Sequence, residues 1–128
     1  MSHFSNIKTQ IRNLDTLKTT LSNLGLSWKE GPCAVRGYQG QTLEAALVLE
    51  QDNAYDIGFA WNGQAYEMVT DLQYWQQPLS VEGFLQKITQ GYALETVLTE
   101  SNKQGFQVAE QQTQADGSIR LVVQRWSA

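Results

Sequence analysis

The side chains of this chain that could take part in the most kinds of chemistry are those of its single histidine and its single cysteine. His3 could act as a general base or pH sensor, or lie solvated near the start of the chain, and we favour the second interpretation. Cys33 has Lys29 and Arg36 nearby, and positive charge favours a reactive thiolate, but we interpret it as a small core residue. One cysteine excludes an intramolecular disulfide and indicates a reducing compartment.

Metal binding and catalysis are not predicted. A closed zinc site needs four ligands, mostly Cys and His at short spacings, and this chain has one residue of each type. The glycine spacing at 37–40 has no lysine after it and matches no phosphate loop or dinucleotide fingerprint. The spacing of the acidic residues does not indicate a pair of carboxylates for acid–base catalysis. We therefore expect no enzyme activity, no catalytic residue, no cofactor and no metal ion.

Charge is unevenly distributed along the chain. Nine basic and 13 acidic residues give a net charge of −4. Residues 1–36 carry a net +3 and residues 37–128 a net −7, and no Lys or Arg occurs from Gly37 to Gln86. This map predicts an acidic surface in the middle of the chain.

Three acidic residues are candidates for that surface. On the expected strands, Glu44, Glu50 and Asp56 have the parity opposite to the apolar residues, so they would share one sheet face. Such a face would steer and hold a basic partner protein. In the alternative interpretation it is a solvated face, neutralised by cations from flanking strands. Those cations would be Lys8, Arg120 and Arg125.

An aromatic pair, Tyr74 and Trp75, allows the same two interpretations. Tyrosine and tryptophan are favoured anchors at protein interfaces, but most such residues belong to a core. We favour the core and keep the pair as candidate partner-binding residues.

Nucleic acid and membrane insertion are not favoured. Phosphates repel an acidic chain unless its basic residues are concentrated. A third, weaker interpretation is that the chain binds RNA through Lys8, Arg12 and Arg36, with Trp28 stacking on a base. The longest apolar run, 45–49, is far shorter than the ~20 residues that span a bilayer, and the chain start does not resemble a signal peptide. We expect a soluble cytoplasmic protein, or a stromal one in a plastid.

The first half of the chain predicts a strand, a helix and a meander. Alternation over 3–11 indicates a strand, and Asn13 is a suitable N-cap for a helix that closes at Gly25. Leu26 would then fold back on Leu21, as in a Schellman ending. Strands follow at 42–50, 55–61 and 64–70, after an irregular strand within 27–40. Asn62-Gly63 is a strong hairpin signal between the last two.

The second half predicts a long helix and a hairpin. Helix signals begin at 78–80 and end at Gly105, and strands at 106–112 and 119–125 flank a turn at Asp116-Gly117. The order predicts one α+β domain, 1–128, in which an antiparallel sheet carries two helices on one face. We expect a ferredoxin-like arrangement with an additional C-terminal hairpin, and the other sheet face partly wet.

Residues along most of the chain carry a resemblance to a known family. They are Met1-Ser2-His3-Phe4-Ser5, Ile7, Thr9, Ile11, the leucine-rich helix to Gly25, then Tyr66, Asp71 and the stretch from Gly91 to Phe106. The sequence resembles the plastid and cyanobacterial family called hypothetical chloroplast reading frame thirty-five, a family of unknown function. The resemblance implies a photosynthetic lineage, a cytosolic or stromal location and an accessory role, and it supplies no catalytic residues.

These observations favour a non-catalytic accessory, assembly or regulatory protein that acts through contacts with a protein partner, which the acidic face predicts to be basic. The alternative is a small-ligand sensor or small enzyme with a pocket between sheet and helices, involving His3, Tyr38 or Trp61. The sequence assigns no oligomeric state.

Overall fold

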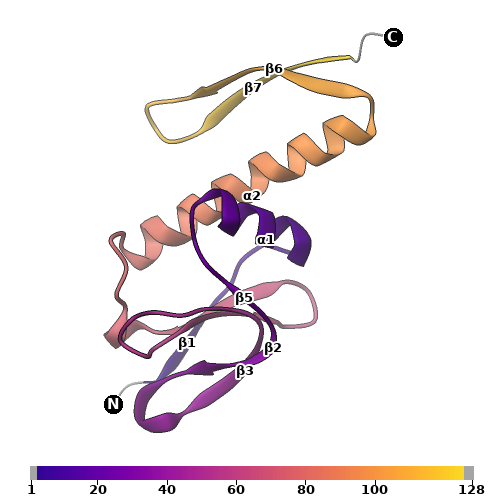
Figure 1. Cartoon of the computed structure of the whole chain (residues 1–128). Helices are drawn as coiled ribbons and strands as arrows, with labels where there is room; N and C mark the ends of the chain where they lie inside the picture. Colours follow the sequence, from indigo (N-terminus) through magenta and orange to yellow (C-terminus); the bar gives the residue numbers. More distant parts are fainter. Residues whose placement is uncertain (1–2, 126–128) are drawn as a thin grey trace.

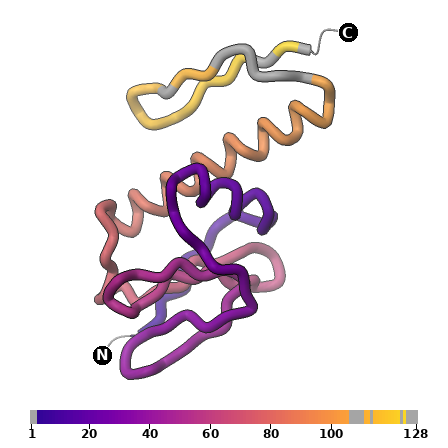
Figure 2. Tube along the Cα trace, in the orientation of Figure 1, coloured from indigo at the N-terminus to yellow at the C-terminus, as the bar shows by residue number. Residues whose placement is uncertain are grey.

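The computed structural model describes residues 3–125, which form two helices and two antiparallel sheets (Figure 1, Figure 2). The helices are α1 (Leu14–Asn23) and α2 (Val81–Lys103). The larger sheet has the order β1-β5-β4-β3-β2, with β1 (Phe4–Ile7), β2 (Lys29–Arg36), β3 (Thr42–Leu49), β4 (Ile57–Trp61) and β5 (Tyr66–Asp71). The smaller sheet pairs β6 (Phe106–Thr113) with β7 (Ile119–Arg125). The predicted α+β class is confirmed.

Helix α1 begins and ends where its local sequence predicts. The Asn13 side chain accepts a hydrogen bond from the Thr16 N–H at 3.1 Å, which satisfies a free donor of the first turn. Beyond the helix, Gly25 has a φ of 76° and the Leu26 N–H donates to the Leu21 carbonyl at 3.0 Å. This is the Schellman contact, and glycine accommodates the left-handed conformation at low cost.

Helix α2 also has its predicted ends and runs unbroken through Gly91. Ser80 caps it by accepting from the Gly83 N–H at 3.1 Å, and Gly105 follows its last turn with a φ of 82°. A Cβ at Gly91 would lie 2.9 Å from Thr20 Cγ2. The glycine therefore allows α1 and α2 to approach each other closely.

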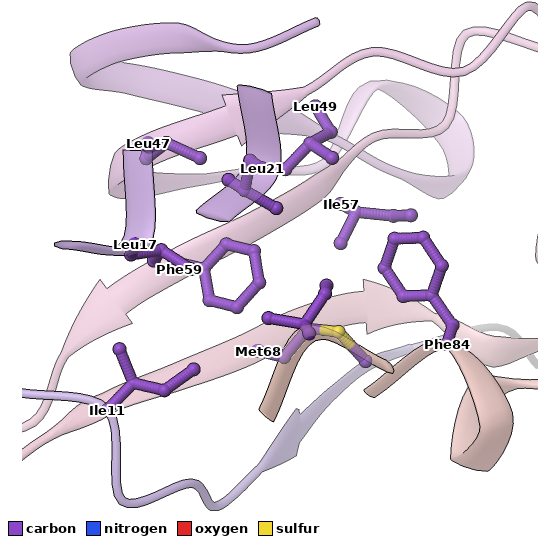
Figure 3. Close-up of a cluster of buried hydrophobic side chains, with 10 residues drawn as sticks. Ile11, Leu17, Leu21, Leu47, Leu49, Ile57, Phe59, Met68 and Phe84 are labelled. Carbon is purple, nitrogen blue, oxygen red and sulfur yellow. The ribbon is translucent and has the colours of Figure 1, made fainter. Parts of the chain in front are cut away.

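The main core lies on one face of the larger sheet, under both helices (Figure 3). Phe59 of β4 has Leu47 and Met68 as its neighbours in register, and all three are 0% exposed. The other buried members of this cluster are Ile11, Leu17, Leu21, Leu49, Ile57, Phe84 and Ile88. Burial of these side chains is the main stabilising contribution that fixes the helices on the sheet.

The opposite face of the sheet is covered by the far half of the β2–β3 hairpin. Register shifts between Glu30 and Cys33, and beyond this irregularity Val35 packs with Ala45 and Val48 in a second core cluster. A Cβ at Gly58 in β4 would overlap Val35 Cγ2, so the hairpin lies directly over that strand. The hairpin therefore covers part of the face that we expected to be partly wet, including β4 around Gly58.

The C-terminal hairpin does not join the larger sheet. Helix α2 leads into β6 and β7, and in Figure 1 these strands lie on the far side of α2 from the larger sheet. The ferredoxin-like detail is not confirmed, because the chain after its second helix does not return to the first sheet. The hairpin itself and its turn at 114–118 were predicted correctly.

The position of the hairpin over β4 predicts the effect of a side chain at Gly58. We expect Gly58→Val to lower the free energy of unfolding by about 1–3 kcal/mol, because the added atoms overpack Val35 and Ala45. Urea unfolding measures this change. The control Thr42→Val adds a branched apolar residue at an exposed position of the same hairpin. It should change the free energy of unfolding by no more than about 0.5 kcal/mol. Equal midpoints for Gly58→Val and the unmodified chain would contradict the hairpin's position.

Candidate functional site

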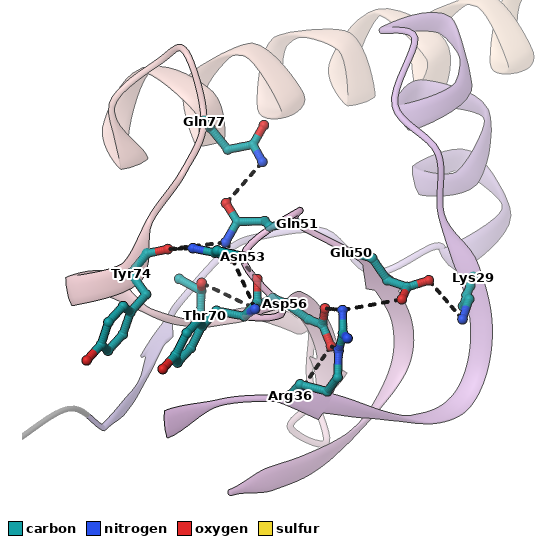
Figure 4. A network of polar contacts seen from close by, with 10 residues as sticks. Lys29, Arg36, Glu50, Gln51, Asn53, Asp56, Thr70, Tyr74 and Gln77 are labelled. Carbon is teal, nitrogen blue, oxygen red and sulfur yellow. Dashed lines mark hydrogen bonds and ion pairs between the residues drawn. The ribbon is translucent and has the colours of Figure 1, made fainter. Parts of the chain in front are cut away.

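Asp56 is enclosed by the backbone and side chain of Arg36 (Figure 4). Its carboxylate is 1% exposed and accepts three hydrogen bonds: from the Arg36 backbone N–H at 2.8 Å, from Nε at 2.9 Å and from Nη2 at 2.8 Å. The Asp56 N–H donates in return to the Arg36 carbonyl at 3.0 Å. The prediction that Asp56 lies on an exposed acidic face is therefore wrong, because that prediction assumed a flat sheet.

Glu50 is exposed, but two cations of β2 meet it. Lys29 Nζ lies 2.8 Å from Glu50 Oε1, and Arg36 Nη2 lies 3.3 Å from Oε2. Hydrogen bonds to Asp56, together with the negative charge of that residue, hold the pKa of the Arg36 guanidinium above its ordinary value. The predicted neutralisation of this face occurs, but the cations that pair with Glu50 are Lys29 and Arg36 of β2. Lys8 and Arg120 are not among them, and the side chain of Arg125 lies outside the described residues.

Glu44 lies elsewhere on the surface. It is exposed and borders a shallow hollow of about 330 Å³ with Pro32 and Trp61. Trp61 is 50% exposed and meets Tyr66 edge-on, with ring centres 4.9 Å apart. The three candidate acidic residues therefore do not form a single acidic patch.

Tyr74 belongs to a stack of three tyrosine rings. Its ring centre lies 4.0 Å from that of Tyr55 and 5.9 Å from that of Tyr38, with nearly parallel planes in both pairs. Its carbonyl accepts a hydrogen bond from Asn53 Nδ2 at 2.8 Å. Gln51, 6% exposed, accepts from the Gln76 N–H at 2.9 Å. These contacts join the loop before β4 to the segment after β5.

Trp75 packs inside the chain. Its indole N–H donates to the Leu79 carbonyl at 2.8 Å, and its ring meets Phe84 edge-on with centres 5.0 Å apart. Phe84 is part of the main core. This geometry agrees with the core interpretation that we favoured, and the indole fixes the approach to α2.

His3 and Cys33 have different surroundings. His3 is exposed just before β1, whereas the half-buried Cys33 packs against the second core cluster, opposite Ala45. Among the side chains that the structure describes within 3–125, no group of three or more His, Cys, Asp and Glu residues is arranged to hold a metal ion. No helix in the same range has the length and apolarity needed to cross a membrane.

The layer between the sheet and the helices is filled with apolar side chains (Figure 3). An apolar hollow of about 360 Å³ lies at its margin, lined by Leu24 and Leu26 on one side and by Leu79 and Phe84 on the other. Of the residues considered for a pocket in this layer, Tyr38 lies in the tyrosine stack and Trp61 at the surface.

A C-terminal arm, which we define as residues 93–125, extends beyond the core (Figure 1). The last fully buried residue of α2 is Ile88, Tyr92 packs against the same core one turn later, and the helix beyond Tyr92 carries the β6–β7 hairpin. A hollow of about 260 Å³ separates the two, with Leu94 and Val97 on the helix and Ile119 and Leu121 on β7. Val97 is 43% exposed. Sequence reasoning predicted the helix and the hairpin but did not predict that they project from the core.

Comparison with known proteins identifies the family. Residues 20–122 match the family described as "Protein of unknown function (DUF1257)". The chain belongs to this family. It is 48% identical over 126 residues to the "Uncharacterized protein ycf35" of Guillardia theta, covering 98% of each chain. The proteins of the same name from Pyropia yezoensis and Cyanophora paradoxa are 43% and 42% identical, covering 99% and 98% of each chain.

The resemblance found in the sequence is confirmed by these relatives, which match along nearly the whole chain. No solved structure matches.

The buried Asp56 carboxylate predicts a stability effect of its removal. Asp56→Asn keeps the shape but turns an acceptor into a donor that faces Arg36, so we expect a loss of about 1–3 kcal/mol of unfolding free energy. Urea unfolding at neutral pH measures it. The exposed Asp52 lies in the same loop and serves as the control. Asp52→Asn should change the free energy of unfolding by no more than about 0.5 kcal/mol. Equal effects of the two variants would contradict the role of the pair.

The tyrosine stack predicts a loss of stability in alkali. Burial, the adjacent Tyr74 and the charge of Asp71 raise the pKa of Tyr55 above its ordinary value of 10.0. Above that pH the unfolded chain has lost a proton that the folded chain retains, so stability falls as the pH rises. Tyr55→Phe should make the fall between about pH 9 and about pH 11 shallower, as measured by urea midpoints. Identical slopes for Tyr55→Phe and the unmodified chain would exclude Tyr55 as the cause.

Proposed function

We propose that this chain is a non-catalytic accessory protein of a photosynthetic lineage, in the cytosol or the plastid stroma, and that it acts through protein contacts made by its C-terminal arm. The family resemblance supports the lineage and the accessory role. The arm replaces the acidic sheet face as the contact surface, because Asp56 is enclosed and Glu50 is paired with cations.

The observation that carries this proposal is that a two-stranded sheet lies apart from the main core. A lone hairpin is marginally stable in water, and a sheet with few strands needs packing on an apolar surface. Here the hairpin rests on the second half of α2, with a hollow of about 260 Å³ between them. Exposed Val97 and half-buried Ile119 and Leu121 leave apolar surface that a protein partner would cover.

The small-ligand alternative has weaker support. Ligand sites combine an apolar hollow with a few convergent polar groups. The hollow beside Leu79 has only Gln77 and Lys87 as polar lining residues. A rise in melting temperature with a specific small molecule would favour this alternative.

Site-specific photocrosslinking in the native host tests the arm. A photoreactive amino acid at exposed Thr99 of α2 or exposed Gln124 of β7 should give a discrete protein adduct that mass spectrometry identifies. The same group at exposed Thr42 or Gln64, both on the larger sheet or its loops, should give none.

Two results would contradict the proposal. One is the absence of adducts from both arm positions in chains that accumulate normally. The other is an equal yield of the same adduct from Gln64, because the contact would then not depend on the arm.

A further inference from the structure

We infer that the arm binds a second copy of this chain, through antiparallel pairing of β7 with β7 of the partner subunit. The inference rests on the proposed function, and it names the partner. Two hairpins joined in this way form one four-stranded sheet. A sheet of three or more strands with an apolar face can be stable in water, whereas a lone hairpin is only marginally stable.

The two outer edges of the hairpin are not equivalent. In the smaller sheet the register shifts between Val108 and Glu110, so β6 carries a bulge, and bulges blunt an edge against further pairing. Strand β7 is regular over Ile119–Arg125 and contains no proline, glycine or acidic residue. Within the described part of the chain neither outer edge has a strand partner. The edge open to pairing is therefore that of β7.

The sequence of β7 suits pairing with itself. Two antiparallel copies centred on Val122 place Leu121 opposite Val123 of the partner subunit. Arg120 then lies opposite Gln124 of the partner subunit. No like charges are directly opposite, and apolar residues meet at the centre, which is the favourable case for cross-strand pairs.

An apolar hollow lies beside β7, the strand with which this partner would pair. Its described lining comes from α2 and from the β7 end of the hairpin, including Val97, Ile119 and Leu121. Ile119 and Leu121 have the same parity, so they share the sheet face that packs on α2. In the dimer both α2 helices would cover that face, and Val97 would lose its exposure.

The surface area of the chain agrees with a missing partner. The accessible surface is 7977 Å², whereas a compact monomer of 14.4 kDa exposes roughly 6,800 Å². The excess is about 1,100 Å². A standard protein interface buries about 800 Å² on each partner. One interface of standard size would therefore bring the surface of the whole chain close to that of a compact subunit of this mass.

Light scattering during size-exclusion chromatography of the full chain tests the inference. We expect twice the chain mass of 14.4 kDa, falling to the monomer on dilution. Val122→Lys should raise the dimer dissociation constant tenfold or more, because two ammonium groups meet at the two-fold axis. Position 122 has the parity opposite to Ile119 and Leu121, so the added charge does not enter the sheet face that packs on α2.

Matched variants separate charge from position. Gln114→Lys adds the same charge in the exposed turn of the arm and should leave the dimer intact. Val122→Cys in a Cys33→Ser background should form a disulfide-linked dimer under mild oxidation, since equivalent positions meet at the axis, whereas Gln114→Cys should not.

Each result decides the inference. The inference would be overturned if the measured mass were that of one chain at every concentration. It would also be overturned if Val122→Lys did not weaken the dimer and Val122→Cys did not form a disulfide-linked dimer. If the monomeric chain still crosslinks through Gln124 to another protein, the dimer is excluded and the proposed function stands. If the chain dimerises but Val122→Lys has no effect and the arm gives no adduct, both fail.

Discussion

The pairing of the Arg36 guanidinium with the buried Asp56 carboxylate holds the β2–β3 hairpin across the sheet face that the helices leave open. It joins positions 20 residues apart, and the reciprocal backbone bonds of the same two residues make the contact rigid. A buried charge that loses its partner is strongly destabilising. Under this clamp Val35 packs on Gly58, and beside it the tyrosine rings join two loops. The second core cluster and the shape of the loops therefore depend on one ion pair.

The same pair explains the uneven charge of the sequence. Bases of the first 36 residues meet acids within the fold: Lys18 pairs with Glu30, Lys29 with Glu50, and Arg36 with Glu50 and Asp56. Strand β2 supplies cations to the long segment that has none. A separation of charge along a chain is thus compatible with intramolecular complementarity, and it need not indicate a charged partner. This removes the main reason for a basic partner on the larger sheet.

Local signals in the sequence predicted the elements, because the atoms that satisfy them are close in the chain. Asn13, Gly25, Ser80 and Gly105 define helix ends by contacts within a few residues. The alternation of β3 and β4 correctly placed Leu47, Leu49, Ile57 and Phe59 in one core. It failed for Ala45 and Trp61, which have the same parity but lie in the second core cluster and at the surface. The prediction that Asp56 lies on an exposed sheet face was wrong. Alternation along a strand indicates which side chains share a face only while the sheet is flat, and here the irregularity between Glu30 and Cys33 bends β2 over the sheet. Nor does any local pattern indicate that β6 and β7 form a separate sheet.

The arm is the part of the fold that the rest does not require. Helix α2 has 23 residues, yet its buried residues, Phe84 and Ile88, lie in its first two turns. Tyr92, one turn beyond Ile88, still packs against the main core, and the turns after it carry the hairpin away from that core. Tertiary packing supplies most helical stability in proteins, so a helix that continues beyond its core needs another surface to pack on. The hairpin supplies only part of that surface, since a hollow of about 260 Å³ remains beside β7. An additional chain at that edge would complete the packing of both the helix and the sheet, which is why the arm, and not the closed sheet, is the part of this fold suited to contact another protein.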